Sequence, residues 1–302
     1  MKLIAPSYYD KFSCIADKCK HSCCVGWEID IDPDTDAYYK NVGGELGERL
    51  AKNIDRSGEV PHFKLCAGER CPFLDCQGLC DIIKELGEDG LCQICDDHPR
   101  YRNFYSDRIE IGLGLCCEAA AELILKSEEK VTLMTIEDDG DDDQLDAEDE
   151  IFFALREKIF SIVQDRENCI KARITTLLDT FKTKMPKKTQ AEWIDTFLSL
   201  EMLDAEWGVR LNKLKITPTE PQYENEIECE QLLVYFLYRH LADGLCDGTI
   251  DERVKFAVLS LDMIISIALA TGESIAEIAR AYSSEIEYSE ENVEKLISLL
   301  SE

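Results

Sequence analysis

Cysteine is the residue that most constrains this chain. Twelve of its fifteen cysteines lie in the N-terminal part of the sequence. They form four groups: Cys14, Cys19, Cys23 and Cys24; Cys66, Cys71, Cys76 and Cys80; Cys92 and Cys95; and Cys116 and Cys117. Thiols at this density, in a chain without an evident export signal, favour thiolates bound to metal over disulfides, because the reducing cytosol keeps structural disulfides rare.

The start of the chain and its apolar runs predict a soluble, cytoplasmic protein. The apolar stretch before Pro6 is Leu3 to Ala5, which is too short for the apolar region of a secretory signal. The longest apolar run, residues 256–272, contains Asp262 and is shorter than the roughly 18 to 20 apolar residues of a membrane span. We therefore expect that run to be a buried helix.

The formal net charge of -29 limits the partners that the chain is expected to bind. Nucleic acids and anionic membranes attract proteins through Lys and Arg, so neither is expected as a partner. A basic protein or a lysine-bearing substrate is compatible with this charge. An acidic surface also keeps a protein soluble without any partner.

Composition divides the chain into a cysteine-rich part and a helical part. Residues 1–135 hold most of the cysteines and many turn signals, such as NVGGELG at 41–47, so their helices and strands should be short. A metal would stabilise such a segment, because its binding free energy adds to folding. Residues 136–150 are strongly acidic and are predicted to be a linker or exposed loop. Residues 151–302 are predicted to form an all-α domain.

Five segments of the C-terminal part repeat apolar residues at three- and four-residue steps, the period of an amphipathic helix. They are residues 151–163, 191–203, 228–244, 251–272 and 291–301. Cys169, Cys229 and Cys246 are scattered through this part and are expected to be small buried side chains. The predicted fold class is mainly α: a cysteine-rich, metal-binding N-terminal subdomain with short strands and loops, followed by an all-α helical domain.

Iron–sulfur clusters and zinc are the two metal groups that suit a sulfur-rich site. Structural zinc is commonly bound by two CxxC hooks, and only Cys92 and Cys95 have that spacing. Iron–sulfur clusters accept ligands from separated loops more readily, since each iron takes one thiolate. Neighbouring side chains such as Cys23 and Cys24 point in different directions, so they serve two centres or one of them is not a ligand. The sequence permits one or two centres, and also a metal-stapled subdomain without chemistry.

Five segments, spread in order through almost the whole chain, carry a resemblance to a known family. They are SYYDKFSCIADKCKHSCCVGWEIDID at 7–32, CPFLDCQGLCDIIKELGEDGLCQICDDHPRY at 71–101, LCCEAAAELIL at 115–125, LLVYFLYRHLADG at 232–244 and YSSEIEYSEENVEKL at 282–296. In these segments the chain resembles the flagellin lysine N-methylase family. An ordered series of such segments is more specific than an isolated CxxC.

The resemblance implies a set of metal ligands. The pattern of the family falls on Cys14, Cys19, Cys23, Cys24, Cys71, Cys80, Cys95 and Cys116, which are predicted to be ligands of one or two 4Fe-4S clusters. Four cysteines are additional to that pattern, namely Cys66, Cys76, Cys92 and Cys117. An additional cysteine could replace a neighbour as a ligand.

The resemblance also implies methyl transfer from S-adenosylmethionine to the ε-amino group of lysines on flagellin. The methyl group of a sulfonium is already activated, and a lysine of pKa about 10.4 must lose its proton before it attacks. Iron is not needed for this displacement, so a cluster would serve either as a scaffold or as a reductant of S-adenosylmethionine that starts radical chemistry. The CxxxCxxC spacing usual in radical enzymes is missing from the sequence. The alternative functions are a non-catalytic, metal-stapled (iron–sulfur or zinc) binding or adaptor protein, and a redox enzyme with another substrate.

Three residues other than cysteine are candidates for cofactor binding. Arg100, beside Tyr101 and close to Cys95, could neutralise cluster charge or hold a carboxylate, or lie on the surface. Tyr235 and Arg239 share one face of a predicted helix. Either both side chains line a pocket, or Tyr235 belongs to the core and Arg239 lies on the surface. We take Arg100, Tyr101 and Arg239 as the candidate cofactor residues and predict no catalytic residue.

Two short patterns predict strands. Alternation in GWEIDID at 26–32 places Trp27, Ile29 and Ile31 on one face and three carboxylates on the other. The carboxylates either attract a lysine or form a face that is only solvated. EIGLGLC at 110–116 resembles the glycine-spaced turn that holds S-adenosylmethionine in doubly wound methyltransferases. The alternating βα pattern of that fold is missing elsewhere, so we predict a strand that leads into a metal loop.

Overall fold

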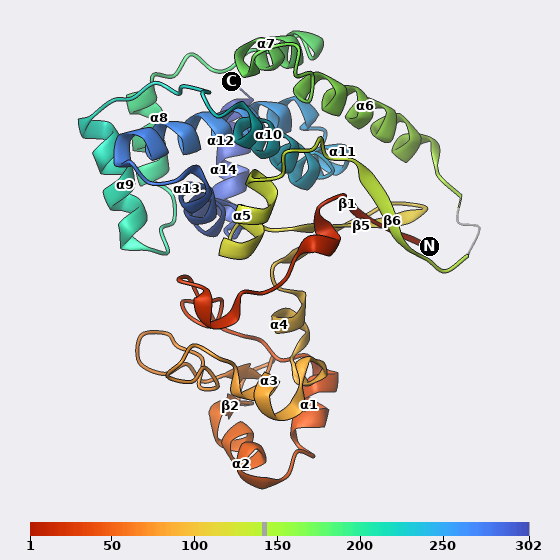
Figure 1. Cartoon of the computed structure of the whole chain (residues 1–302), viewed down its shortest axis with the longest axis vertical. Helices are drawn as coiled ribbons and strands as arrows, with labels where there is room; N and C mark the ends of the chain where they lie inside the picture. Colours follow the sequence, from red (N-terminus) through yellow and green to blue (C-terminus); the bar gives the residue numbers. More distant parts are fainter. Residues whose placement is uncertain (141–143, 302) are drawn as a thin grey trace. The chain divides into compact units, whose positions relative to one another are not determined.

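The computed structural model describes residues 1–140 and 144–301, which form two compact units (Figure 1). The cysteine-rich unit is Ser13–Arg100, and the helical unit combines Met1–Phe12 with Tyr101–Glu302. The sequence placed the boundary near residue 135, whereas the structure groups the preceding stretch with the helices. The reason is that strands of this stretch pair with the first strand of the chain, and its helix packs on two C-terminal helices.

Short elements make up the cysteine-rich unit, as its turn signals predict. They are η2 (Ala16–Lys18), α1 (Pro33–Tyr39), α2 (Gly44–Asn53), β2 (Ile54–Asp55), β3 (His62–Phe63), α3 (Asp81–Leu86), η3 (Glu88–Gly90) and α4 (Gln93–Asp97). Asp32 caps α1 by accepting a hydrogen bond from the backbone N–H of Thr35 at 2.9 Å. Gly87 ends α3 with a φ of 82°, a conformation that favours glycine.

The apolar core of the cysteine-rich unit includes aromatic and aliphatic side chains from most of these elements. Its members other than cysteine are Ile29, Ile31, Tyr39, Leu46, Leu50, Ile54, Phe63, Phe73, Leu74 and Ile82. The alternation predicted for residues 26–32 is confirmed, because Ile29 and Ile31 are buried while Glu28 and Asp30 are exposed. The segment is nevertheless not a regular strand: it pairs with the β3 region through one isolated bridge and a few backbone hydrogen bonds.

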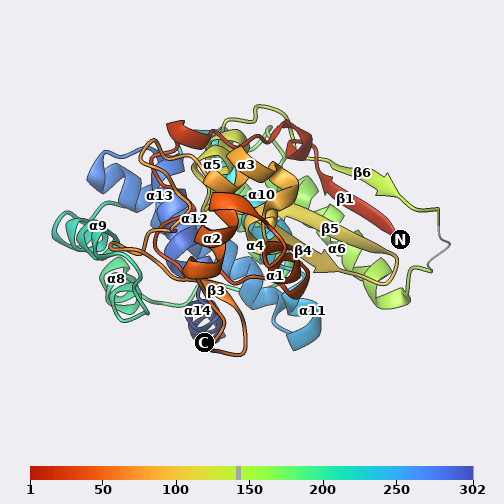
Figure 2. The ribbon, with the colours of Figure 1, turned by 90° about the horizontal axis from the view of Figure 1, so that it is seen from below.

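A four-stranded sheet belongs to the helical unit, with strand order β4-β5-β1-β6 (Figure 2). Its strands are β1 (Lys2–Pro6), β4 (Arg100–Phe104), β5 (Arg108–Leu113) and β6 (Leu133–Asp138). Strand β1 runs parallel to β5 and antiparallel to β6. Strand β5 confirms the strand predicted in EIGLGLC. Gly112 is needed there, since a Cβ atom at this position would lie 2.3 Å from the ring of Tyr101.

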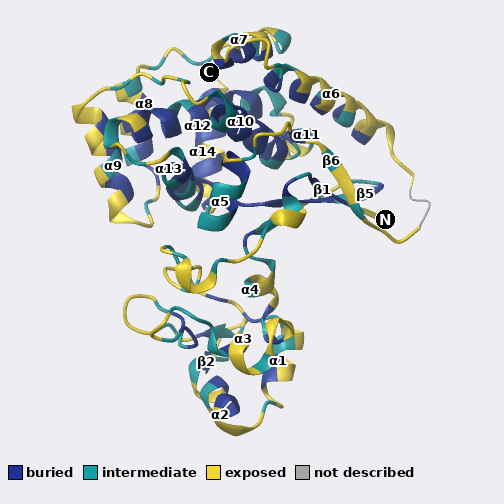
Figure 3. Ribbon diagram, in the orientation of Figure 1, coloured by how far each residue is buried: buried dark blue, intermediate teal, exposed yellow. Residues whose placement is uncertain are grey.

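Helices form most of the helical unit, so the prediction of a mainly α fold is confirmed. They are η1 (Tyr9–Lys11), α5 (Glu118–Leu125), α6 (Ala147–Val163), α7 (Ile170–Thr180), α8 (Gln190–Leu198), α9 (Ala205–Ile216), α10 (Glu226–His240), α11 (Asp243–Asp247), α12 (Ile250–Thr271), α13 (Ile275–Tyr282), η4 (Ser283–Glu287) and α14 (Glu290–Leu300). Helix α12 contacts α9, α10, α13 and α14, and it is buried along most of its length (Figure 3).

Helix α12 has 22 residues and is long and apolar enough to cross a membrane by length and composition. Its most apolar window is 78% buried inside the protein, so the prediction of a buried helix at 256–272 is confirmed. Cys229, on α10, is buried as predicted. The same prediction is wrong for Cys169 and Cys246, which are exposed because one precedes α7 and the other lies on the short α11.

The acidic run at 136–150 is divided between two elements. Strand β6 extends to Asp138, and α6 begins at Ala147. Asp146 caps α6 by accepting a hydrogen bond from the backbone N–H of Asp149 at 2.8 Å. Carboxylates are favourable at this end of a helix, since its dipole is positive there. The predicted linker is therefore shorter than expected, and its residues 141–143 lie outside the described residues.

A buried ion pair joins the sheet to the helices. Arg156 on α6 donates to both carboxylate oxygens of Glu110 on β5, at 2.6 and 2.7 Å. The two residues are 4% and 0% exposed. A bidentate pair of this kind fixes the relative orientation of the two elements as well as their contact.

Replacing Arg156 with Met is expected to destabilise the protein by about 3 to 5 kcal/mol, because Glu110 would be left as an unpaired buried charge. Urea unfolding followed by circular dichroism measures this loss. Lys158→Met, at an exposed position of the same helix, is the matched control and should cost less than about 0.5 kcal/mol. Equal small costs for both variants would contradict this role of the ion pair.

Candidate metal centre

Five cysteines gather in the core of the cysteine-rich unit. They are Cys24, Cys71, Cys80, Cys92 and Cys95, and we call them the thiol cluster. Cys71 and Cys92 are buried, with 5% and 1% of their surface exposed, and the other three are half-buried against the same core. All five are free thiols. The structure therefore brings together four of the eight predicted ligands and adds Cys92, which is additional to the pattern of the family.

Backbone pairing holds the segments of the thiol cluster together. The backbone N–H of Cys71 donates to the carbonyl oxygen of Cys24 at 2.8 Å. Leu74, three residues after Cys71, forms an isolated bridge with Cys80. Three of the cysteines are thus placed by hydrogen bonds of the main chain, and their thiols lie close enough to interact electrostatically.

The other two cysteines come from the start of α4. Cys92 is the residue before this helix, and Cys95 lies in its first turn, where its backbone N–H donates to the carbonyl oxygen of Cys92 at 2.9 Å. A hydrogen bond between the two thiols raises the pKa of Cys95 and lowers that of Cys92. Burial raises the pKa of Tyr39, and the nearby Cys92 and Cys95 add to this effect.

The thiols of the thiol cluster can ionise together only if positive charge lies close to them. Burial raises the pKa of the Cys71 thiol to about 12, and repulsion from Cys24, Cys80 and Cys92 contributes. Burial also raises the pKa of Cys80. A hydrogen bond with the thiol of Cys23 lowers the pKa of Cys24 to about 7. Several thiolates cannot share this core unless a cation compensates them, and a coordinated metal deprotonates its thiol ligands outright.

The remaining cysteines of this unit lie nearer its surface. Cys14, Cys23, Cys66 and Cys76 are exposed, and Cys19 is half-buried. Two of their loops are neighbours: a Cβ atom at Gly78 would lie 3.9 Å from the Cα of Asp17. The loop that follows Cys76 therefore faces the loop between Cys14 and Cys19.

Cys116, the eighth predicted ligand, belongs to the helical unit. Its thiol donates a hydrogen bond to the hydroxyl of Tyr288 at 3.0 Å. Burial raises its pKa to about 12. Cys117 follows as the residue that precedes helix α5.

Close to Cys116 lies a group of Tyr101, Tyr235, Arg239, Glu287 and Tyr288, which we call the tyrosine–arginine cluster. Tyr235 and Glu287 are buried, Tyr101 and Arg239 are half-buried, and Tyr288 is exposed. The guanidinium of Arg239 donates to the hydroxyl of Tyr235 at 2.8 Å and pairs with Glu287 at 3.3 Å. It also lies over the rings of Tyr101 and Tyr288, at 4.9 and 5.4 Å from their centroids. Arg239 is therefore held by other side chains, and the alternative that it is a plain surface arginine is wrong.

Two members of this cluster have unusual polar environments. Burial alone would raise the pKa of Glu287, but Arg239 and His240 lower it to about 2. The hydroxyl of Tyr101 is buried and has no hydrogen-bond partner within residues 1–140 and 144–301. Of the three candidate cofactor residues, Tyr101 and Arg239 come together here. Arg100 is the last residue of the cysteine-rich unit, and its guanidinium donates to the carbonyl oxygen of Asp96 at 2.8 Å.

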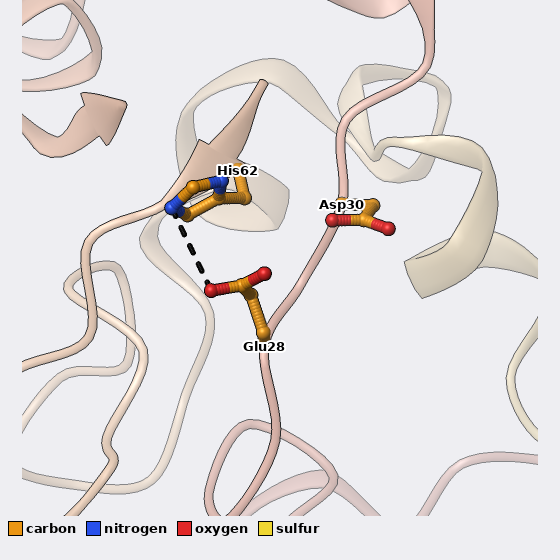
Figure 4. Close-up of side chains that lie close together, drawn as sticks. All are labelled: Glu28, Asp30 and His62. Atoms are coloured by element: carbon orange, nitrogen blue, oxygen red, sulfur yellow. Dashed lines mark ion pairs between the residues drawn. The ribbon is translucent and has the colours of Figure 1, made fainter. Parts of the chain in front are cut away.

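A third polar group lies on the surface of the cysteine-rich unit (Figure 4). Glu28, Asp30 and His62 have their ligand atoms within 4.8 Å of one another, and His62 Nε2 is 3.6 Å from a carboxylate oxygen of Glu28. Alternation in the sequence indicates the two carboxylates, whereas no sequence pattern indicates His62. Only the bridge between Asp30 and His62 brings that imidazole beside them.

Three known proteins are similar in sequence to this mainly α, thiol-rich chain. It is 31% identical over 137 residues to the flagellar biosynthetic protein FliU of Salmonella muenchen, covering 42% of this chain and 79% of that protein. It is 30% identical over 137 residues to proteins named Lysine-N-methylase from Salmonella typhimurium and Salmonella choleraesuis, covering 42% of this chain and 33% of each. No family model and no solved structure matches the chain.

The chain belongs to the flagellin lysine N-methylase family. The family resemblance seen in the sequence is thereby confirmed over 42% of the chain. The chain spans about a third of the length of the relatives named Lysine-N-methylase.

Cys92 provides a test of the thiol cluster. If this cluster binds iron through Cys24, Cys71, Cys80 and Cys95, then Cys71→Ser should lose most of the bound iron, whereas Cys92→Ser should lose it only if Cys92 is a ligand in place of a neighbour. Elemental analysis of anaerobically purified protein measures iron per chain. Cys169→Ser, an exposed position in the helical unit, is the control and should retain the iron. Full iron content in Cys92→Ser would mean that Cys92 is only a packed thiol.

The lowered pKa of Glu287 predicts that the stability of the protein depends on pH. Its pKa is lowered from 4.5 to about 2, so its ion pairs stabilise the fold above pH 4.5, and that contribution is lost as the pH falls toward 2. The difference in Tm between wild type and Glu287→Gln should therefore shrink as the pH falls from about 5.5 to about 3.5. Glu290→Gln, at an exposed position nearby, should match wild type throughout. A constant difference for Glu287→Gln would contradict the assignment.

Proposed function

We propose that this chain binds a 4Fe-4S cluster and takes part in methyl transfer from S-adenosylmethionine to lysines of flagellin. The observation that carries the proposal is the convergence of five free thiols in one core, in a member of this family. Relatives named Lysine-N-methylase support the reaction, and the name flagellar biosynthetic protein FliU supports a flagellar substrate.

The donor chemistry of the thiol cluster suits an iron–sulfur cluster. Four thiolates are enough for a 4Fe-4S cluster, so one of the five thiols would be a neighbour or a replacement ligand. Cys24, Cys71, Cys80 and Cys95 belong both to the thiol cluster and to the pattern of the family, and we propose them as ligands, with Cys92 as the alternative. The bound cluster would supply the positive charge that these thiolates need. Free thiols in this number also favour a reducing, cytoplasmic setting.

The proposed transfer is a displacement at carbon. The neutral lysine nitrogen attacks the methyl group, the carbon–sulfur bond breaks, S-adenosylhomocysteine leaves, and the ammonium formed loses a proton to solvent or a base. Because the pKa of a free lysine is about 10.4, the site must favour the neutral amine by desolvation or a nearby positive charge. The tyrosine–arginine cluster offers partly buried surroundings and the positive charge of Arg239, whose side chain is 13% exposed.

The tyrosine–arginine cluster is the proposed contact for S-adenosylmethionine. The buried hydroxyl of Tyr101, which lacks a partner among the described residues, is available to a polar group of a ligand. Aromatic faces also attract a sulfonium cation, although Arg239 lies over the Tyr101 ring in this structure. Tyr101 and Arg239 are therefore proposed to orient the cofactor.

A metal-stapled binding protein without catalysis is the second candidate. It is favoured by the relative named flagellar biosynthetic protein FliU, because that name states no methylase activity. The same thiol cluster would then serve to fold the unit, and the chain would bind flagellin without modifying it.

Methyl transfer can be tested directly. The anaerobically purified chain, with its iron and sulfide content measured, is incubated with S-adenosylmethionine and flagellin, with and without a reductant. We expect lysine peptides to gain methyl groups, as measured by mass spectrometry. Tyr101→Phe should lower this activity while iron content and fold are retained, because it removes only the unpartnered hydroxyl. No methylation by a chain with a full complement of iron, but binding of flagellin, would establish the second candidate.

A further inference from the structure

A groove with a volume of about 410 Å³ lies on the surface of the cysteine-rich unit. Its lining includes five apolar residues, Ile31, Pro33, Val60, Pro61 and Ile94, which we call the apolar floor. Two of these side chains are exposed although they are aliphatic, Val60 at 47% and Ile94 at 37%. An exposed apolar floor in a groove is the part of a surface that gains most from being covered by a ligand.

The charged residues that line the groove are acidic. Asp30, Asp32, Glu59 and Asp97 line it, and its lining residues include no Lys or Arg. Asp32 is fixed in place, since its carboxylate accepts hydrogen bonds from the backbone N–H groups of Thr35 and Gln93, both at 2.9 Å. The groove therefore combines an apolar floor with negatively charged lining residues.

A second hollow continues this surface. It has a volume of about 270 Å³ and shares Asp32 and Gln93 with the groove. Glu88, Asp89 and Asp96 line it, so the charge has the same sign along both hollows. An extended ligand with more than one basic side chain fits this distribution of charge.

Helix α4 separates the groove from the thiol cluster. Successive residues of a helix are turned by about 100°, so Gln93, Ile94 and Asp97 share one face of α4, and Cys92 and Cys95 share the opposite face. The first face lines the groove, and the second belongs to the thiol cluster. The groove therefore lies one helix away from the candidate metal centre.

We propose that this groove docks a basic side chain, lysine or arginine, from a segment of the protein substrate. The methylene stem would cover Val60 and Ile94, and the charged head would lie against Glu59 and Asp97. Long basic side chains bury their stems in this way while their charge stays near water and carboxylates. The identity of the partner as the methylation substrate rests on the proposed function, whereas the chemistry of the occupant rests on the groove alone.

The docked residue is not the lysine that reacts. Neighbouring carboxylates stabilise the protonated ammonium and raise its pKa, which removes the lone pair needed for attack on a methyl group. The groove would therefore hold a second basic residue, near the target lysine in the substrate. Loss of this second basic residue should weaken binding and raise KM while kcat stays the same, because the residue does not contact the reacting atoms.

Binding of fluorescently labelled flagellin and of oligolysine to the full chain, measured by anisotropy, tests the groove without any need for methyl transfer. Glu59→Gln/Asp97→Asn is expected to weaken binding by about fivefold at low salt, the effect of losing two partly exposed charge pairs. The loss should fade at high salt, which screens such pairs. Glu48→Gln/Glu85→Gln removes the same charge from exposed positions outside the groove and should bind as wild type does.

Ile94→Ser tests the apolar floor separately. It should weaken binding at both low and high salt, because lost apolar contact is not screened. Iron content equal to that of wild type shows that the opposite face of α4 is intact. Failure of the wild-type chain to bind either probe, or equal binding by the groove and control variants, overturns the inference. So does a wild-type dimer that Ile94→Ser converts to a monomer in sedimentation, since a second copy would then fill the groove.

The two proposals fail separately. If the groove variants weaken binding but no lysine is methylated, the groove stands and the catalytic proposal falls. If methylation occurs with the same KM in the groove and control variants, the catalytic proposal stands and the groove falls.

Discussion

The burial of several thiols in one small core is the constraint on which the cysteine-rich unit depends. Burial raises the pKa of Cys71 and Cys80, so these thiols resist ionisation as long as no cation is near. The longest helix of this unit has ten residues, and apolar packing between such short elements gives limited stability. Metal ligation would cross-link the separate segments, and its binding free energy would add directly to folding.

The helical unit is stabilised in a different way. Its long central helix α12 is enclosed by α9, α10, α13 and α14, and apolar burial supplies most of the stability. Charged groups inside it are paired, as Arg156 is with Glu110 and Arg239 with Glu287. The buried hydroxyl of Tyr101 departs from this pattern, which is why it is a natural contact for a ligand. Metal, cofactor and substrate thus have separate proposed sites built on different interactions.

Much of the local structure could be predicted from the sequence, because it depends on periodicity. Helix α12 and the burial of Ile29 and Ile31 followed from spacing alone. The ligand set was harder, since the family pattern selected Cys23 and left out Cys92, whereas the structure buries Cys92 and exposes Cys23. Burial of a single thiol depends on which distant segments pack over it, and a short sequence pattern does not predict this packing.

The sequence by itself determined the mainly α fold, the short elements of the cysteine-rich part and the supply of sulfur donors. Tertiary structure decided which thiols meet, because the backbone hydrogen bond from Cys71 to Cys24 joins segments that are distant in the chain. It also grouped Cys116 with the helices, since β5 pairs with the first strand of the protein. Local patterns arise from side chains a few residues apart, whereas a binding site requires distant segments to pair in one specific register.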